Sequence, residues 1–263
     1  MIVGRRVLAA ALLALMALLT PAAKSMAAEQ AKGGVSILLY HRFGPTVADS
    51  MTVRTSVFEQ HLAWLNSHGY KIVPLRGVVD DLLAGKPLAE SSSVVITADD
   101  GHRSVYTELY PLILKYRFPV TLFIYPSAIS NASYALTWEQ LAEMSASGLV
   151  DIQSHTYWHP NFHQERKRLD DAHYRQFVAM QLQKSKTVLE SHTKNPVDML
   201  AWPFGIYDAE LDLAARTAGY VVAFSIDRGP VRLGANPFEL PRYLMTDSDQ
   251  GARFAAIAQG SAR

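Results

Sequence analysis

Short runs of apolar residues alternate along the chain with longer segments in which apolar positions recur at helical spacing. A continuous apolar run is typical of a strand buried on both faces, because a strand with one face in water alternates apolar and polar residues. We expect strands at residues 35–40, 71–75, 94–97, 120–125, 149–154, 199–202, 221–226 and 240–245. We expect helices from 56 to near 69, at 78–83, from 137 to near 148, at 171–192 and at 208–218.

Residues at the ends of these helices support the assignment. Ser56 is expected to cap the first helix and Gly69 to end it. Thr137, with Gln140 three positions later, matches a capping box. The repeated order of strand and helix predicts an α/β fold with a parallel sheet covered by helices. Seven or eight such units favour a barrel over an open sheet, and the lack of a Pro-, Gly- or Ser-rich linker favours one domain.

The first residues have the pattern of a targeting segment. Arg5 and Arg6 precede an apolar run at residues 7–19, which is short for a membrane span. Small residues at 25 and 27 predict a signal peptide at 1–27, with cleavage before Ala28; an uncleaved anchor is the alternative. We therefore expect an exported protein, in the periplasm or outside the cell, with a mature domain at 28–263 that has no transmembrane segment.

Composition and charge narrow the function less. The chain has 25 Lys and Arg against 24 Asp and Glu, a net charge of +1, so no basic surface is expected and nucleic acid is not an expected partner. The charged run at 164–168 is interpreted as a solvated helix approach or loop. Cysteine is absent, which excludes disulfides and a lipoprotein anchor.

Polar residues gather just after the predicted strands. Asp99 and Asp100 follow the strand at 94–97 and precede Gly101. Neighbouring side chains on a strand point to opposite faces, so one carboxylate could bind a metal ion while the other acts as a base. An ordinary turn is the alternative for this sequence. The carboxyl ends of parallel strands form the face where α/β enzymes build active sites, which favours a functional interpretation.

Two histidines follow the strand at 149–154. His155 and His159 are four residues apart and can face one metal ion if the segment coils into a turn. Imidazole suits zinc, cobalt, nickel or iron. Two histidines and one carboxylate, with an open position for water, form the arrangement of a catalytic metal site.

The segment Trp202-Pro203-Phe204-Gly205 follows the strand at 199–202. Proline fixes the backbone and glycine permits a tight turn, so this segment could aim a backbone N–H at a developing oxyanion. A strand-terminating turn with two aromatic residues in the core is the alternative.

Taken together and in this order, the three motifs resemble those of the polysaccharide deacetylase family, the NodB-homology domains of carbohydrate esterase family 4. The matching segments are 97–101, 155–159 and 201–205, and the resemblance extends over about residues 35 to 245. It implies a distorted (β/α) barrel of about seven parallel strands. Residues 39–43 also look like the branch that deacetylates poly-β-1,6-N-acetylglucosamine in biofilm matrices.

The resemblance implies a role for each motif residue. Asp99 would be the general base, and Asp100, His155 and His159 would hold one divalent ion, with zinc first and cobalt, nickel or iron as alternatives. Phe204 would offer its backbone N–H to the oxyanion. The implied function is metal-dependent hydrolysis of N-acetyl groups on an exported or cell-envelope polysaccharide, an N-acetylglucosamine-type polymer, with export machinery as a candidate partner. An O-acetyl esterase on a decorated glycan, and a non-catalytic polysaccharide-binding or assembly protein, are the alternatives.

The chain departs from the family pattern at two places. Ala201 stands where many members have an arginine that orients the base, and we expect Arg242 to replace it from another strand by reaching Asp99. Thr246 stands where the family has the histidine that acts as the general acid. His41, at the end of the first predicted strand, is the candidate for this acid, and a packing role is its alternative.

Overall fold

The computed structural model describes residues 34–88 and 92–262. The predicted signal peptide at 1–27 lies outside the described residues. In the part of the chain that is described, no helix has the length and apolar character needed to span a membrane.

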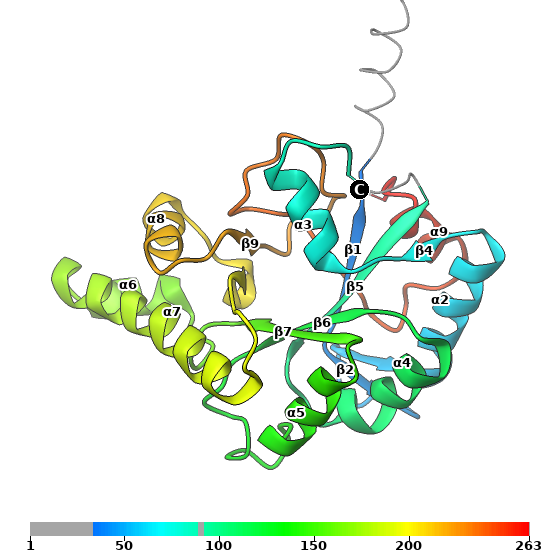
Figure 1. The fold of residues 1–263 in the computed structure, drawn as a ribbon, viewed down its shortest axis with the longest axis horizontal. Coiled ribbons are helices and arrows are strands. Elements are labelled where there is room, and N and C mark those ends of the chain that lie inside the picture. The colour runs from blue at the N-terminus through cyan, green and yellow to red at the C-terminus, as the bar shows by residue number, and fades with distance from the viewer. Residues whose placement is uncertain (1–33, 89–91, 263) are drawn as a thin grey trace, which may run out of the picture.

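The main sheet is parallel and curls into a half-barrel, as Figure 1 shows. Its strands follow the order β10-β1-β5-β6-β7-β8-β9, and β4 pairs with the start of β5. An isolated parallel bridge joins Phe224, at the end of β9, to Leu240 in the segment that leads into β10. The fold class expected from the sequence, an α/β barrel of about seven parallel strands, is confirmed. The strands are β1 (Ser36–Tyr40), β4 (Lys71–Ile72), β5 (Ser93–Asp100), β6 (Val120–Ile124), β7 (Val150–Ser154), β8 (Met199–Ala201), β9 (Val222–Phe224) and β10 (Tyr243–Leu244).

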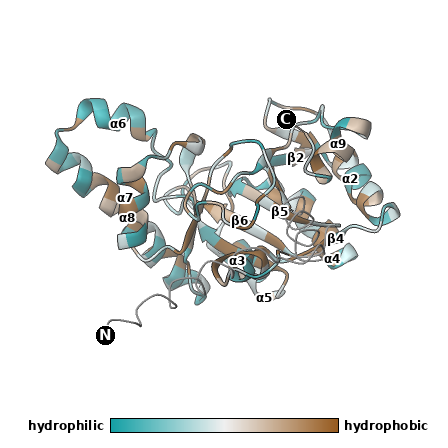
Figure 2. Ribbon diagram, turned by 90° about the horizontal axis from the view of Figure 1, so that it is seen from above, coloured by the Kyte–Doolittle hydropathy of each residue, from teal (hydrophilic) through white to brown (hydrophobic). Residues whose placement is uncertain are grey.

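Helices cover the outside of the sheet, and α6 and α7 extend from one end of the molecule (Figures 1 and 2). A small parallel pair, β2 (Arg42–Gly44) with β3 (Thr52–Arg54), follows β1. The helices are α2 (Thr55–Ser67), α3 (Leu75–Leu83), η1 (Val105–Leu109), α4 (Tyr110–Tyr116), α5 (Trp138–Ala146), α6 (Phe162–Arg168), α7 (Asp171–Thr193), η2 (Pro203–Gly205), α8 (Ala209–Thr217) and α9 (Gly251–Ala258).

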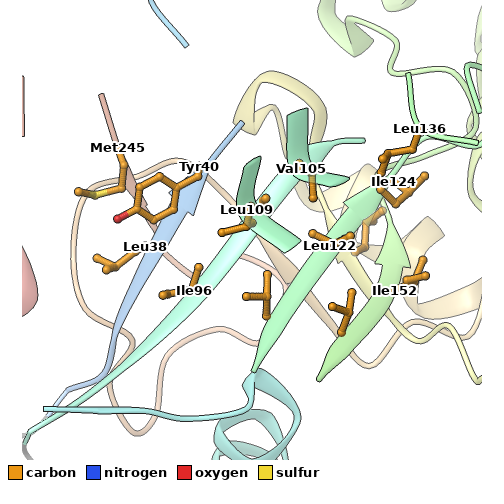
Figure 3. Close-up of a cluster of buried hydrophobic side chains, with 14 of the residues drawn as sticks. Leu38, Tyr40, Ile96, Val105, Leu109, Leu122, Ile124, Leu136, Ile152 and Met245 are labelled. Atoms are coloured by element: carbon orange, nitrogen blue, oxygen red, sulfur yellow. The ribbon is translucent and has the colours of Figure 1, made fainter. Parts of the chain in front are cut away.

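Alternation along the strands divides the core into two clusters. Leu38, Ile96, Leu122 and Ile152 pack on the helix-covered side of the sheet, together with Tyr40 (Figure 3). Ile37, Val95 and Phe123, at intervening positions of the same strands, belong to a second cluster, which includes the buried face of α3. Asp99 lies on this second side of β5, because side chains an even number of positions apart on a strand point to the same face.

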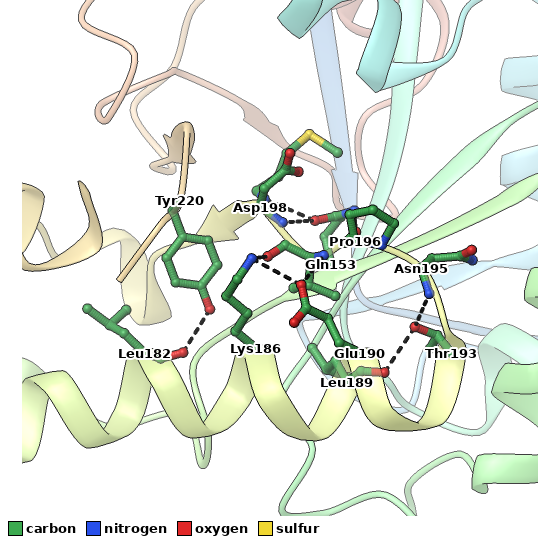
Figure 4. Close-up of polar contacts among 12 residues, drawn as sticks. Gln153, Leu182, Lys186, Leu189, Glu190, Thr193, Asn195, Pro196, Asp198 and Tyr220 are labelled. Carbon is green, nitrogen blue, oxygen red and sulfur yellow. Dashed lines mark hydrogen bonds and ion pairs between the residues drawn. The ribbon is translucent and has the colours of Figure 1, made fainter. Parts of the chain in front are cut away.

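Buried polar contacts join α7 to the edge between β7 and β8 (Figure 4). The Gln153 Oε1 atom accepts hydrogen bonds from the backbone N–H groups of Asp198 and Met199, at 3.0 and 2.9 Å. The Lys186 ammonium donates to the Val197 carbonyl, and the Tyr220 hydroxyl donates to the Leu182 carbonyl at 3.0 Å. These bonds supplement the short β7–β8 ladder and hold the end of β7, where the histidine segment begins.

Local assignments are confirmed at some helix ends and wrong at others. The capping box of Thr137 and Gln140 is present. Ser56 is not the cap of α2, because the helix begins at Thr55 and the preceding residue, Arg54, makes no side-chain cap bond. The Asp247 carboxylate instead accepts from the Arg54 backbone N–H at 2.9 Å, so a residue distant in sequence holds the start of α2. The charged run at 164–168 lies in α6.

Candidate active site

Three side chains predicted to bind metal converge at the carboxyl end of the sheet. Asp100 ends β5, while His155 and His159 follow β7. The Asp100 Oδ1 atom lies 3.7 Å from the Nε2 atom of each histidine. One ligand atom from each of the three residues lies within 4.8 Å of the others. A single ion could therefore contact all three.

Unusual backbone angles bring the side chains together. Asp100 has φ 74°, Thr156 φ 64° and His159 φ 62°, all in the left-handed region that non-glycine residues seldom occupy. At Asp100 this conformation interrupts the alternation of side chains along β5, so Asp99 and Asp100 can face the same site although they are neighbours. At Thr156 and His159 it coils the segment and turns both imidazoles toward Asp100. Strained residues of this kind concentrate at functional sites.

The imidazole of His155 is oriented by the backbone. Its Nδ1 atom lies 2.7 Å from the Ala201 carbonyl oxygen, to which Nδ1–H donates, and this leaves the Nε2 lone pair facing Asp100. Burial lowers the pKa of His155 to about 3, although the Asp99 charge acts in the opposite direction. Burial also lowers the pKa of His159. Both rings are therefore neutral near pH 7, the state a metal ligand requires.

The carboxylate of Asp100 fits a cation. Burial raises the pKa of Asp100. Its Oδ1 atom is buried and has no hydrogen-bond partner among the described residues. A buried carboxylate oxygen without a donor is costly. Because this oxygen faces two neutral imidazole nitrogens, a divalent ion would supply the missing partner, and the donor set of one oxygen and two nitrogens suits such an ion.

Asp99 is held by Arg242. The two Arg242 terminal nitrogens donate to the two Asp99 oxygens at 2.9 and 2.8 Å, and the Nε atom donates to the Ser225 carbonyl at 3.1 Å. Both side chains are buried. Arg242 also lies against the rings of Phe123 and Phe224, with centroid distances of 5.3 and 5.9 Å. The contact expected from the gap at Ala201 is confirmed.

The charge of Arg242 keeps Asp99 ionised. Burial alone would raise the pKa of Asp99, but the nearby guanidinium and its hydrogen bonds, with a contribution from His155, hold this pKa below its ordinary value. An Asp99 oxygen also lies 3.8 Å from the His155 Nε2 atom. An ionised carboxylate thus stands beside Asp100, His155 and His159, whose ligand atoms cluster.

His41 and Phe204 border the same site. His41 lies between β1 and β2, and burial lowers its pKa, while Asp99 and Asp100 act to raise it. Its Nδ1 atom is buried and has no hydrogen-bond partner in the described part of the chain. Phe204 has φ 57° in the η2 turn, and its ring centroid lies 4.5 Å from that of His159.

Thr246 has a structural contact instead of a free acidic group. Its hydroxyl and its backbone N–H both donate to the Asp249 carboxylate, at 2.8 and 2.7 Å. Asp249 is fully buried. The position that carries the family's general acid is therefore part of a closed turn.

Two tyrosines next to the site were not predicted. Tyr125 directly follows β6, and its ring centroid lies 5.4 Å from that of His159. Its hydroxyl forms a hydrogen bond of 2.9 Å with the hydroxyl of Tyr134. The position of Tyr125 at a strand end was the available signal. Tyr134 lies in an irregular loop with no sequence periodicity, so only the structure places it here.

Comparisons with known proteins agree with this geometry. The family model described as polysaccharide deacetylase matches residues 87–223, just over half of the chain. The poly-beta-1,6-N-acetyl-D-glucosamine N-deacetylase of Escherichia coli strain K12 is 25% identical over 270 residues, covering 88% of this chain and 40% of that protein. The protein of the same name from Staphylococcus aureus strain MRSA252 is 26% identical over 200 residues, covering 74% of this chain and 68% of the relative.

Solved structures agree as well. IcaB from Ammonifex degensii is 27% identical and superposes with a TM-score of 0.75, covering 86% of this chain and 97% of that one. The Streptococcus pyogenes deacetylase PplD in complex with acetate shares the fold at 20% identity, with a TM-score of 0.75 and coverage of 86% and 98%. The chain thus spans two fifths of the length of the Escherichia coli relative but nearly all of these two structures. With the motifs, the fold and the family match in agreement, the chain belongs to the polysaccharide deacetylase family.

Proposed function

We propose that this protein hydrolyses the N-acetyl groups of an exported polysaccharide of the poly-β-1,6-N-acetylglucosamine type. The observation that carries the proposal is an ionised carboxylate, Asp99, fixed by Arg242 beside the group Asp100, His155 and His159. The names of the Escherichia coli and Staphylococcus aureus relatives support the choice of polymer.

Asp100, His155 and His159 would hold one divalent ion, with zinc as our first choice. Such an ion, when bound, supplies Lewis-acid polarisation of a carbonyl oxygen and makes water more acidic. The neutral imidazoles and the partnerless Asp100 oxygen support this assignment. Cobalt, nickel and iron also suit the same donors.

Asp99 acts as the general base in this proposal. Its lowered pKa means that it is ionised at neutral pH and ready to accept a proton from water. Arg242 is a positioning residue, because its planar fork fixes both carboxylate oxygens in one orientation. Each oxygen has a further lone pair, so a bidentate contact leaves Asp99 able to accept a proton.

Phe204 and His41 complete the proposed set. The backbone N–H of Phe204 stabilises the oxyanion that forms as the amide carbonyl is attacked, and the rigid Pro203–Gly205 turn supports this role. His41 delivers a proton to the leaving amine, since an amine anion is a very poor leaving group. This step requires the protonated imidazole, which burial disfavours and the charges of Asp99 and Asp100 favour. The partnerless Nδ1 atom of His41 supports this assignment.

The place of action is also part of the proposal. Residues 28–263 would form the mature domain after removal of a signal peptide, and the protein would act in the periplasm or outside the cell. The polymer is the expected partner, and the machinery that exports it is a further candidate.

The test is acetate release by purified protein. A β-1,6-linked N-acetylglucosamine pentamer should be deacetylated, chelation should abolish the activity, and added zinc should restore it. An O-acetylated xylan is the comparison substrate. Faster release from xylan than from the pentamer would replace the N-deacetylase with an esterase. Release from neither substrate by zinc-loaded protein would contradict the proposed function.

A further inference from the structure

An exposed aromatic side chain stands near the metal-ligand cluster. Tyr134 lies in the loop between β6 and α5, and 43% of its surface is exposed. Its hydroxyl is bonded to the hydroxyl of Tyr125, whose ring lies beside His159. An exposed aromatic ring beside a polar site offers a flat surface on which the apolar face of a ligand can pack.

Tyr134 is fixed to the segment that carries the two aspartates. The Arg103 backbone N–H donates to the Tyr134 carbonyl at 2.8 Å, and the Leu136 N–H donates to the Gly101 carbonyl at 2.9 Å. Between them, His102 and Ala135 form an antiparallel bridge. The ring of His102 is parallel to that of Tyr134, with a centroid distance of 6.4 Å. Hydrogen bonds on both sides of Tyr134 thus join its loop to residues 101–103, the segment that directly follows Asp99 and Asp100.

The sheet order places a second aromatic residue across the site. β7, which carries the histidine segment, lies between β6 and β8. Tyr125 and Tyr134 follow β6, and Phe204 follows β8. Phe204 is 54% exposed. The end of β7 is therefore bordered by aromatic rings on either side, and the rings of Tyr125 and Phe204 both contact that of His159.

We propose that Tyr134 stacks on a sugar ring next to the one being deacetylated, and that it strengthens binding of an oligosaccharide relative to a substrate that has no neighbouring sugar ring. This inference rests on the proposed function and adds a specificity-determining residue to it. The C–H faces of a pyranose ring are apolar and pack well on an aromatic ring. A ring that is already held in place loses little conformational entropy on binding.

The experiment measures steady-state kinetics of the zinc-loaded protein on two substrates. These are the β-1,6-linked N-acetylglucosamine pentamer and 4-nitrophenyl acetate, which has no sugar. The variants are Tyr134→Leu, which removes the ring but keeps apolar bulk, and Tyr134→Phe, which keeps the ring. Tyr116→Ala is the matched control, because Tyr116 is a 49%-exposed tyrosine on the distant helix α4.

We expect Tyr134→Leu to raise KM for the pentamer by roughly three- to tenfold, the range of an aromatic stacking contact, with a much smaller change on the ester. Tyr134→Phe keeps the ring but loses the bond to the Tyr125 hydroxyl, so its KM for the pentamer should rise less than that of Tyr134→Leu. Tyr116→Ala should keep the wild-type KM. If the wild type deacetylates the pentamer and Tyr134→Leu leaves KM unchanged, or lowers both activities equally, the inference is wrong and the proposed function stands. If the wild type cleaves only the ester, the proposed function and the inference both fail.

Discussion

At the scale of single residues, the pair of Asp99 and Arg242 is a buried ion pair on which both stability and the proposed base depend. Both side chains are removed from water and are held by two direct hydrogen bonds. Breaking a buried ion pair by removing one partner typically costs about 3–5 kcal/mol, because the other charge stays buried and uncompensated. The stability of the barrel therefore depends on Asp99, the proposed base, staying ionised and bound to Arg242.

Replacing Asp99 by Asn separates a base from a metal ligand. We expect Asp99→Asn to keep its bound metal while turnover falls on the order of a hundredfold or more, because an amide cannot accept the proton from water. Metal content of the purified variant and acetate release from the pentamer test this. Asp100→Asn is the matched comparison and should lose metal. Metal loss in Asp99→Asn, with retention in Asp100→Asn, would show the two roles to be reversed.

Replacing Arg242 by Lys tests the geometry of the clamp. Lysine keeps the charge but cannot donate two parallel hydrogen bonds, so Asp99 would lose its fixed orientation. We expect kcat to fall by roughly tenfold or more with metal content unchanged, since a misplaced catalytic group can cost a hundredfold. Arg242→Met, which leaves the Asp99 charge unpaired, should also lower the free energy of unfolding. Wild-type kcat in Arg242→Lys would rule out the positioning role.

The sequence predicted the composition of the site better than its shape. Motif spacing brought forward Asp99, Asp100 and the two histidines, and the missing arginine at Ala201 pointed to Arg242. Tyr134 was not predicted, because its place depends on a loop bridged to residues 102–103 and not on any periodic pattern. The closed turn at Thr246 was not predicted either, since it depends on the buried carboxylate of Asp249.

At the scale of elements, the strands were predictable and some helices were not. No helix was assigned from the sequence at 105–116, a segment that contains Pro111. In the structure a π-helical turn, η1, precedes α4. Pro111 lies in the first turn of α4, where the backbone N–H groups have no partner within the helix, so the N–H that proline lacks costs no helical hydrogen bond. The strand expected at 71–75 ends at Ile72, because α3 begins directly after Pro74.

The η2 turn offers a test at this scale. Gly205 has φ 67°, and a Cβ atom there would lie 2.5 Å from the Ile226 Cγ1 atom. We expect Gly205→Ala to destabilise the fold by about 1–3 kcal/mol and to lower kcat by displacing the Phe204 N–H. Gly148→Ala is the matched control, since Gly148 has φ 71° but no atom of the described residues would lie within 4 Å of an added Cβ. Denaturant unfolding and acetate release should separate the two variants; equal effects would mean that the contact with Ile226 is unimportant.

At the scale of the whole molecule, the barrel followed from the order of apolar strands and helices, whereas its closure did not. The strand at 240–245 was expected, but β10 spans only Tyr243–Leu244. Arg242, just before it, reaches across to Asp99 on β5 and bonds to Ser225 after β9. Backbone hydrogen bonds between residues 223–227 and 237–242 join the two ends of the sheet, and the Arg242 side chain adds a buried polar link that no hydrophobic pattern could reveal.

A buried histidine makes the stability of the whole fold depend on pH. His61 on α2 is hydrogen-bonded to the Tyr40 hydroxyl on β1 at 2.9 Å and to the Asp249 carbonyl at 2.6 Å, and it stacks on Phe254 of α9. The carbonyl can only accept, so Nε2 carries the proton and Nδ1 accepts from the tyrosine. The hydrogen bond that Tyr40 donates to Nδ1 requires the neutral ring. Burial lowers the pKa of His61 to about 4, although Asp249 acts to raise it.

The sign of the pH effect follows from these states. The unfolded chain binds a proton at His61 near pH 6.5, whereas the folded protein does so only near pH 4. The contribution of His61 is therefore fully present above pH 6.5 and is lost as the pH falls toward 4, by up to about 1.4 kcal/mol per pH unit. We expect the unfolding free energy to fall over this range.

In His61→Phe the unfolding free energy should depend less steeply on pH, even though the variant is less stable at pH 7. Denaturant unfolding of the wild type and of His61→Phe at pH 7, 6 and 5 measures the difference in their unfolding free energies. The histidines of the metal site are the same in both proteins, so their contribution cancels. Parallel slopes would mean that His61 does not stay neutral in the folded protein.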